Sequence, residues 1–392
     1  MSEQYANRMG TVHRSFIREI LKVTADPSII SFAGGLPNPR MFPAEAIQVA
    51  ATSALGGTGA VTLQYSTSEG DPVLRESIAS RYVNRKNLSI GSDDLVITTG
   101  SQQCLDLIGK VFLNKGDKVV IESPGYLGAI QAFSLFEPEF VSVSLESDGP
   151  DLEELEKAFA AGAKVFYAVP NFQNPSGVSY SLDKRKAVAE LVDKYDVLFV
   201  EDDPYGDLRF KGDHMPTVFS FQKKPGILLG SFSKIAAPGF RIGWIVASGE
   251  RRDKLIIAKQ AADLHTSTVT QAIMREYVLN VDMDAHIARI CETYGSHRDI
   301  MVNMIDKYFP DSVESTRPEG GMFLWVTLPN GCSSMKLFDK AIEKKVAFVP
   351  GKPFYTNGGG DNSLRLNFSN AEPDRIEEGI KRLAESLEEF LG

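Results

Sequence analysis

One stretch of the sequence combines an amine with groups that bind phosphate. Residues 231–243 read SFSKIAAPGFRIG and carry two hydroxyls (Ser231 and Ser233), a lysine (Lys234) and an arginine (Arg241). The stretch follows one apolar run and precedes another, and α/β proteins place ligands in loops at the ends of sheet strands. Hydroxyl and guanidinium groups bind phosphate, and a lysine amine beside them is a nucleophile. A single loop lysine is usually only solvated, but these features together favour a phosphate-linked amine site.

Two further polar segments follow apolar runs. Residues 201–205 read EDDPY, where Asp202 at the tip of a buried strand can pair with a protonated ring nitrogen and Tyr205 can reach a neighbouring oxygen. The alternative is an acidic turn that caps the next element. Residues 171–177 read NFQNPSG, and the amide of Asn174 offers donors to a phenolic oxygen. The alternative there is a plain turn, because Asn-Pro and Ser-Gly mark tight loops.

A fourth segment, residues 98–103 with the sequence TTGSQQ, runs from a predicted strand into a predicted helix. Glycine lets the backbone turn closely, and the free N–H groups at a helix start form an anion site beside Ser101 and Gln102. The alternative is an ordinary N-capping serine. The chain has no Walker A sequence, and residues 56–59 (GGTG) lack the third glycine and the preceding strand of a dinucleotide fingerprint. A nucleotide site is therefore not predicted.

Together these segments supply a phosphate site, an amine nucleophile, a carboxylate for a ring nitrogen and two donors for a phenolic oxygen. Pyridoxal 5′-phosphate held as a Schiff base with a lysine needs this set. In these motifs and their order the sequence resembles the fold-type I, class I and II aminotransferases, which use that cofactor. The resemblance runs from SFAGGLP at residue 31 to LRLNFS at residue 364, through NPSG, EDDPYG, SFSK, PGFRIGW and EGGMFLW. It implies an α/β fold with a mostly parallel seven-stranded sheet covered by helices, and a smaller α+β domain.

The resemblance implies a role for each motif residue. Lys234 carries the cofactor and moves a proton between substrate and cofactor, while Asp202 keeps the ring nitrogen protonated. Tyr205 and Asn174 contact the phenolic oxygen. The residues that match the phosphate site of the family are Ser101, Gln102, Ser231, Ser233 and Arg241.

Two tyrosines extend the implied site. Tyr126, in the sequence SPGY, matches the aromatic residue that stacks on the face of the cofactor. Tyr65, in the sequence LQYS, matches the tyrosine that reaches the phosphate of the neighbouring subunit. The second match implies a homodimer with shared active sites.

The resemblance also implies how the substrate is bound. Arg365 matches the arginine that binds the substrate α-carboxylate as a bidentate pair, and Gly35 matches a substrate-binding position. Strand alternation places Arg365 on the face opposite Leu364 and Leu366, facing away from the core. The alternative for Arg365 is a surface arginine on an edge strand.

The N-terminal sequence narrows the implied substrate. Residues 15–22 (SFIREILK), followed by FAGGLPNPRMFP, resemble the subgroup of 2-aminoadipate, aromatic and branched-chain aminotransferases. In that subgroup a mobile N-terminal helix covers the site, and its arginine, here Arg18, pairs with a distal carboxylate. The hypothesis is that Arg18 admits 2-aminoadipate and glutamate and swings away for apolar amino acids. The alternative is a solvated helix arginine.

The pattern between the motifs predicts the elements that hold them. Short apolar runs alternate with amphipathic stretches such as Ser101–Leu113 and Asp183–Tyr195, which is typical of a mostly parallel sheet covered on both faces. The predicted strands are Leu95–Thr99, Lys118–Glu122, Glu139–Ser144, Lys164–Val169, Val197–Asp202, Gly226–Ser231 and Ile242–Ala247.

After about residue 282 the alternation stops, which favours a second domain of the α+β class. The elements predicted there are helix Ala285–Tyr308, strands Met322–Thr327 and Ser363–Phe368, and helix Pro373–Leu391. We therefore expect an N-terminal arm over residues 1–42 with one short helix (Ser15–Thr24). We expect a large cofactor-binding domain over 43–284 and a small C-terminal domain over 285–392.

The composition limits the classes of function. A chain of 392 residues buries enough core to need no disulfide or structural metal, and its three cysteines form no CxxC pair. The five histidines show no metal-ligand spacing, so no metal is predicted. The net charge of −9 disfavours nucleic acid as a partner. No stretch has the apolar length of a membrane span or signal peptide, so we expect no membrane contact and a cytoplasmic protein.

The expected reaction is amino-group transfer from an L-amino acid to a 2-oxo acid such as 2-oxoglutarate, by a ping-pong route. Two alternatives stay open. A β-lyase or decarboxylase on the same fold would share the residues that bind the cofactor. The effector module of a transcription regulator would need a preceding DNA-binding domain, for which the about 30 residues before the FAGGLP turn are too few.

Overall fold

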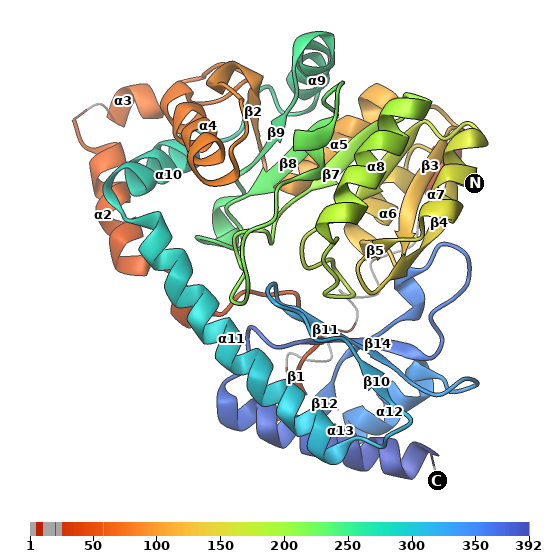
Figure 1. Ribbon diagram of the computed structural model, residues 1–392. Helices are drawn as coiled ribbons and strands as arrows, with labels where there is room; N and C mark the ends of the chain where they lie inside the picture. The colour runs from red at the N-terminus through yellow and green to blue at the C-terminus, as the bar shows by residue number, and fades with distance from the viewer. Residues whose placement is uncertain (1–4, 11–19, 21–25, 58, 392) are drawn as a thin grey trace.

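The computed structural model describes residues 5–10, 20, 26–57 and 59–391. Its largest feature is an eight-stranded sheet in the upper half of Figure 1, with a four-stranded sheet below it. The strands of the large sheet are β2 (Leu95–Thr98), β3 (Lys118–Ser123), β4 (Glu139–Glu146), β5 (Gly149–Pro150), β6 (Val165–Ala168), β7 (Leu198–Asp202), β8 (Ile227–Ser231) and β9 (Gly243–Val246).

The order of strands in the large sheet is β2-β9-β8-β7-β6-β3-β4-β5. Neighbouring strands from β8 to β4 run parallel, whereas β9 is antiparallel to both β2 and β8. Each of the seven predicted strands is present, and β5 is a short additional strand antiparallel to β4. The predicted mostly parallel sheet is therefore confirmed, and the carboxyl ends of β3, β6, β7 and β8 meet at one edge.

Helices connect and cover these strands. The α-helices are α2 (Ala44–Leu55), α3 (Gly59–Thr62), α4 (Pro72–Lys86), α5 (Ser101–Phe112), α6 (Leu127–Ser134), α7 (Leu152–Ala160), α8 (Leu182–Tyr195), α9 (Gly249–Ala262), α10 (Thr268–Asn280), α11 (Met283–Tyr308), α12 (Ser334–Glu343) and α13 (Pro373–Leu391). Short 3-10 helices are η1 (Asn7–Gly10), η2 (Pro39–Met41), η3 (Ser92–Asp94), η4 (Val218–Phe221), η5 (Pro238–Phe240) and η6 (Lys352–Phe354).

Both faces of the large sheet are buried. On β6, Val165 and Tyr167 belong to one hydrophobic cluster, which includes residues of α5 and α6. Phe166 and Ala168 belong to a second cluster, which includes residues of α7 and α8. Because successive strand side chains point to opposite faces, this division shows why the strands read as continuous apolar runs.

The C-terminal part is built on the smaller sheet. Its order is β10-β11-β14-β13, with every neighbouring pair antiparallel. Figure 1 shows α11 running along one side of the molecule from α10 beside the large sheet to α13 below the small one. The predicted strands and helices after residue 282 are confirmed. The strands are β10 (Glu314–Ser315), β11 (Phe323–Thr327), β13 (Val349–Pro350) and β14 (Ser363–Asn367).

The segment before α2 packs on this C-terminal part. Strand β1 (Ile30–Ser31) pairs in parallel with β12 (Val346–Ala347), and the backbone oxygen of Phe32 accepts a hydrogen bond from Asn367 N at 2.9 Å. Residues 33–36 are thereby carried from the small sheet toward the edge of the large one. The predicted helix Ser15–Thr24 lies outside the described residues, except for Ile20.

Candidate active site

A cavity of about 190 Å³ opens at the carboxyl ends of β6, β7 and β8. Most of the residues predicted from the motifs line it, together with Val169 and Pro204 from the same loops. The predicted residues in its wall are Gly35, Ser101, Tyr126, Asn174, Asp202, Tyr205, Ser231, Ser233, Lys234 and Arg365. The topology therefore brings together four motifs that are far apart in the sequence.

Lys234 stands in the turn after β8. Its Nζ donates a hydrogen bond to the backbone oxygen of Gly35 at 2.9 Å. Burial lowers the pKa of Lys234 to about 8, and the positive charges of Arg365 and Arg241 act in the same direction. A lysine with this pKa has a substantial neutral fraction near neutral pH, so it can act as a nucleophile and as a base.

Asp202 ends β7 and is 2 % exposed. Its Oδ2 accepts a hydrogen bond from the hydroxyl of Tyr167 at 2.7 Å, while Oδ1 is buried with no hydrogen-bond partner among the described residues. Burial raises the pKa of Asp202 to about 6, against the lowering effect of Tyr167. A buried carboxylate oxygen without a donor needs one from a ligand, and a protonated ring nitrogen is such a donor.

Tyr167 is a residue that the sequence reasoning missed. It lies on β6 and is fully buried, so its sequence context is that of a core aromatic residue. Only the register of β6 against β7, which pairs Tyr167 with Val200 and Ala168 with Glu201, brings its hydroxyl to Asp202. A tyrosine in an apolar strand shortly before a polar loop is a weak signal for this contact.

Asn174 and Tyr205 face each other across the cavity wall. Asn174 Nδ2 donates to the Tyr205 hydroxyl at 3.3 Å, and Asn174 Oδ1 accepts from Arg365 Nη1 at 2.7 Å. Burial raises the pKa of Tyr205, so the hydroxyl stays protonated. Both residues therefore keep a hydrogen-bond donor available for an oxygen in the cavity.

Arg365 is a buried arginine on an inner strand, so the alternative of a surface arginine on an edge strand is wrong. The side chain is 2 % exposed, and β14 lies between β11 and β13. Its Nη2 donates to the backbone oxygen of Ala33 at 2.7 Å, and the guanidinium carbon lies 4.3 Å from the centre of the Phe323 ring. Burial lowers the pKa of Arg365 to about 10. Its Nε has no partner among the described residues, which leaves a donor for a carboxylate.

The amino end of α5 forms an anion site at the other side of the cavity. Gly100 precedes the helix with φ of +75°, and a Cβ there would lie 2.3 Å from Arg241 Nη2. The Arg241 guanidinium therefore lies directly against the helix start, whose free N–H groups attract anions. Ser231 Oγ lies 2.9 Å from Ser233 Oγ and accepts from the backbone N of Ser233 at 3.1 Å. These groups together suit a phosphate.

Among the described residues, three of the predicted ones do not line the cavity. Arg241 lies against the start of α5 instead. Gln102 Nε2 donates instead to the backbone oxygen of Gly128 at 3.1 Å. Tyr65 is 79 % exposed, and its ring packs edge-on against His265 at 5.8 Å. Arg18 lies outside the described residues.

The described part of the chain holds no group of three or more His, Cys, Asp or Glu side chains that could hold a metal ion. Of the helices in the same residues, none is long and apolar enough to cross a membrane.

Comparisons with known proteins show the family of this chain. The family model of Aminotransferase class I and II matches residues 38–383, and the chain belongs to that family. It is 44 % identical over 385 residues to an aromatic-amino-acid aminotransferase of Thermococcus litoralis, covering 96 % of this chain and 92 % of the relative. It is 42 % identical over 395 residues to a 2-aminoadipate transaminase of Thermus thermophilus, covering 100 % of this chain and 98 % of the relative.

A solved structure is similar over the same length. It is an alpha-aminoadipate aminotransferase from Thermus thermophilus, complexed with N-(5′-phosphopyridoxyl)-L-leucine. The TM-score is 0.93 at 41 % identity, and the match covers 100 % of this chain and 98 % of that one. The expected fold-type I architecture and aminotransferase class are thus confirmed, and neither the lyase nor the regulator alternative is favoured.

Proposed function

We propose that this chain uses pyridoxal 5′-phosphate to move an amino group from an acidic or apolar L-amino acid to 2-oxoglutarate. The observation that carries the proposal is one cavity lined by Lys234, Asp202 and Arg365. The amine of Lys234 is a nucleophile, and neither Asp202 Oδ1 nor Arg365 Nε has a hydrogen-bond partner among the described residues. These groups fit this cofactor and an amino acid. When bound, the cofactor supplies an aldehyde carbon for the amino group and a ring that withdraws electrons from the substrate Cα.

Each residue then has a distinct task. Asp202 Oδ1 would accept the proton of the ring nitrogen, while Tyr167 fixes the carboxylate through Oδ2. Asn174 and Tyr205 donate to the phenolic oxygen, and Tyr126 covers one face of the cavity. The phosphate would be held at the start of α5 by Ser101, Ser231, Ser233 and Arg241. Gln102 would contribute its backbone N–H, because its side chain is bonded to Gly128.

Lys234 and Arg365 act on the substrate. Arg365 binds the α-carboxylate, which orients the Cα–H bond. Burial lowers the pKa of Lys234 to about 8, so Lys234 can take the proton from the substrate Cα and pass it to the cofactor. Gly35 lines the substrate side of the cavity, and its backbone oxygen accepts the hydrogen bond from Lys234 Nζ at 2.9 Å.

Arg18 sets the substrate class in this proposal. Support comes from the relatives, whose names include both a 2-aminoadipate and an aromatic-amino-acid enzyme. Arg18→Ala is expected to lower kcat/KM for L-2-aminoadipate and L-glutamate about tenfold or more, and to leave L-leucine and L-phenylalanine unchanged. Lys22→Ala, on the same predicted helix, is the control. Equal effects on acidic and apolar donors would contradict the role of Arg18.

The assembly and organisation are also part of the proposal. The protein acts as a cytoplasmic homodimer in which Tyr65 of each chain reaches the phosphate of its neighbour. The arm (residues 1–42), large domain (43–284) and small domain (285–392) meet at the cavity. Support comes from Ala33 and Gly35, whose backbone oxygens bind Arg365 and Lys234 from the other two parts.

The first test is the absorption spectrum of the purified chain supplied with pyridoxal 5′-phosphate. A visible band should form, fade with L-glutamate or L-2-aminoadipate in separate cuvettes, and return with 2-oxoglutarate. Lys234→Ala should lack this cycle. No visible band would exclude the cofactor assignment. Without 2-oxoglutarate, transamination releases at most one equivalent of keto acid per cofactor, so continued keto-acid release under those conditions would favour a lyase.

A further inference from the structure

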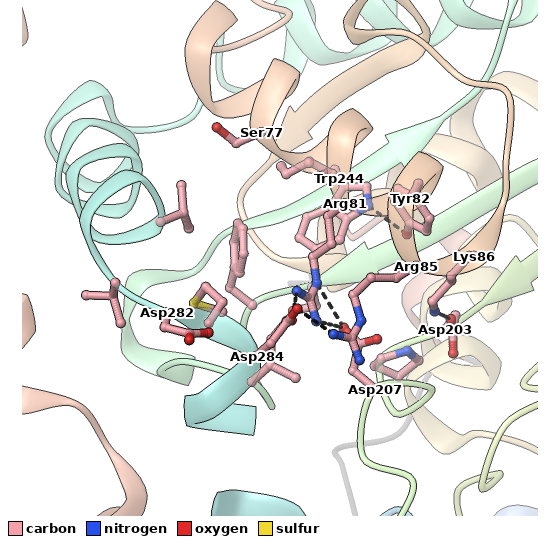
Figure 2. A pocket seen from close by; sticks show the side chains of 18 residues that line it. Ser77, Arg81, Tyr82, Arg85, Lys86, Asp203, Asp207, Trp244, Asp282 and Asp284 are labelled. Atoms are coloured by element: carbon pink, nitrogen blue, oxygen red, sulfur yellow. Dashed lines mark hydrogen bonds and ion pairs between the residues drawn. The ribbon is translucent and has the colours of Figure 1, made fainter. Parts of the chain in front are cut away.

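The acidic motif contains a second carboxylate that the proposed mechanism does not use. Asp203 follows Asp202, and successive side chains of an extended chain point to opposite sides. Asp202 lines the active-site cavity, whereas Asp203 lines a separate cavity of about 270 Å³ behind it. Figure 2 shows Asp203 in that second cavity beside Lys86, with Arg81, Asp207 and Asp284 close by. The side chain of Asp203 is 0 % exposed.

Asp203 joins three segments of the chain. Its Oδ2 forms an ion pair with Nζ of Lys86, the last residue of α4. Its Oδ1 accepts hydrogen bonds from Asn171 Nδ2 at 2.8 Å and from the backbone N of Gly206 at 2.9 Å. Asn171 is held in turn by Arg185, whose Nη2 donates to Asn171 Oδ1 at 2.6 Å.

Two of the joined segments carry the donors for the phenolic oxygen. Asn171 begins the loop that contains Asn174, and Gly206 follows Tyr205 directly. Asn174 and Tyr205 contact each other at 3.3 Å, which is close to the limit of a hydrogen bond. Their contact alone therefore does not fix their relative position, whereas the two short bonds to Asp203 Oδ1 tie both loops to one atom.

The neighbouring pair Arg81–Asp207 offers a comparison. Arg81 Nη2 lies 3.0 Å from Asp207 Oδ2, and both residues line the same cavity as Asp203 and Lys86 (Figure 2). This pair also links α4 to the turn after β7. Asp207 has no hydrogen bond to the 171–177 loop among the described residues, so it shares the ion pairing of Asp203 without its link to Asn174.

We infer that Asp203 is a positioning residue for amino-group transfer, which holds Asn174 and Tyr205 in register through its Oδ1. Lys86 supplies the counter-ion that lets this carboxylate be buried. The inference rests on the proposed cofactor site. Asp203 then has two separate properties. Its acceptor atom Oδ1 sets the relative position of Asn174 and Tyr205, and its negative charge contributes to the stability of the fold.

Three variants test this separation. Asp203→Ala removes both properties, and Asp203→Asn keeps an acceptor oxygen but removes the charge. Asp207→Ala removes a neighbouring carboxylate that also faces Arg81 and Lys86, and leaves Asp203 Oδ1 in place. For each, the measurements are kcat/KM, the thermal unfolding midpoint, the cofactor dissociation constant of the cofactor-free chain, and the pH midpoint of the visible band. If Asn174 and Tyr205 donate more weakly, the phenolic oxygen keeps more negative charge. That charge stabilises the proton on the neighbouring nitrogen, so the pH midpoint of the band moves upward.

We expect all three variants to unfold at lower temperature. Asp203→Ala should raise the band midpoint by about half a pH unit or more, weaken cofactor binding about tenfold and lower kcat/KM about 10- to 100-fold. Asp203→Asn and Asp207→Ala should keep the band midpoint and stay within about threefold of the wild type in kcat/KM. A purely structural role of Asp203 would change the band midpoint in step with the unfolding temperature in all three variants. The proposed role changes the band midpoint in Asp203→Ala alone.

Two results would overturn the inference: a band midpoint in Asp203→Ala equal to that in Asp207→Ala, or an Asp203→Asn variant as impaired as Asp203→Ala. If Asp203→Ala does not fold, Asn171→Ala removes the same hydrogen bond from the other side and is expected to raise the midpoint similarly. An unchanged midpoint in Asn171→Ala then overturns it. Absence of the band in the wild-type chain would instead refute the proposed function, whatever the variants do.

Discussion

At the scale of single residues, the surroundings of Lys234 set the pKa of its amine. It is partly buried in the turn after β8, and the charges of Arg365 and Arg241 act on it. With its pKa near 8, about a tenth of Lys234 is neutral at pH 7, compared with about one part in three thousand for a lysine at 10.5. The reactivity of Lys234 toward an aldehyde should therefore follow an unusually low pH midpoint.

The prediction concerns trapping of pyridoxal 5′-phosphate on the cofactor-free chain with borohydride. Attachment to Lys234, measured by peptide mass spectrometry at short times, should rise through about pH 8. Because Arg365 contributes to the lowered pKa, Arg365→Met should move the midpoint upward, while Arg365→Lys keeps the charge and should move it less. A midpoint near that of surface lysines would show that Lys234 is not perturbed.

The residues that the sequence could predict are those whose role is local to a motif. Lys234 and Asn174 stand in loops after apolar strands, and Asp202 ends such a strand. Each has Gly, Pro or hydroxyl neighbours, which is a recognisable context. Tyr167 and Asp203 could not be assigned in this way. Their partners, Asp202 and Asn171, are brought to them by strand register and by loop packing, and no spacing in the sequence encodes either contact.

At the scale of elements, the start of α5 depends on the backbone of Gly100. Its φ of +75° lies in the left-handed region, and the space that a side chain would need is occupied by Arg241. The helix start and the arginine therefore make one anion site only because residue 100 has no Cβ.

Gly100→Ala should lose about 1–2 kcal/mol of unfolding free energy through the strained backbone. It should also weaken cofactor binding about tenfold, because the new Cβ displaces Arg241 from the helix start. The matched control is Gly116→Ala, since Gly116 has φ of +82° but no atom of the described residues lies within 4 Å of a Cβ there. Denaturant unfolding should show similar losses in the two variants, whereas titration of the cofactor-free chain should show weaker binding in Gly100→Ala alone. Equal cofactor affinities would contradict the role of Gly100.

Element patterns could predict strands and helices but not what covers them. Alternation in 363–368 correctly separated Arg365 from Leu364 and Leu366. It could not show that Arg365 is buried, because the atoms that cover it come from Ala33, more than 300 residues earlier, and from the ring of Phe323 on β11. Burial of this kind depends on the packing of the N-terminal segment against the small sheet, which a local pattern does not describe.

At the scale of the whole molecule, large apolar side chains are exposed around Tyr65. They belong to α2, α3, the loop after α3, the loop before α10, and α10 itself, and α2 and α3 both pack on α10. The residues are Val49, Leu55, Val61, Leu63, Tyr65, Leu264 and Leu279. Exposed apolar side chains gathered on adjoining elements favour a protein interface. In a dimer formed through this surface, Tyr65 of each copy would lie at the interface.

The homodimer with shared sites that we propose predicts that two inactive variants restore each other's activity. In a mixture of Tyr65→Ala and Lys234→Ala chains that exchange subunits, one site of each mixed dimer would combine Lys234 of one chain with Tyr65 of the other, so about a quarter of wild-type activity should return. The control mixture is Asp202→Ala with Lys234→Ala. These two residues line one cavity of a single chain, so every site keeps one defect and no activity should return. Sedimentation must show dimers in both mixtures, and an inactive first mixture despite subunit exchange would place Tyr65 outside the neighbouring site.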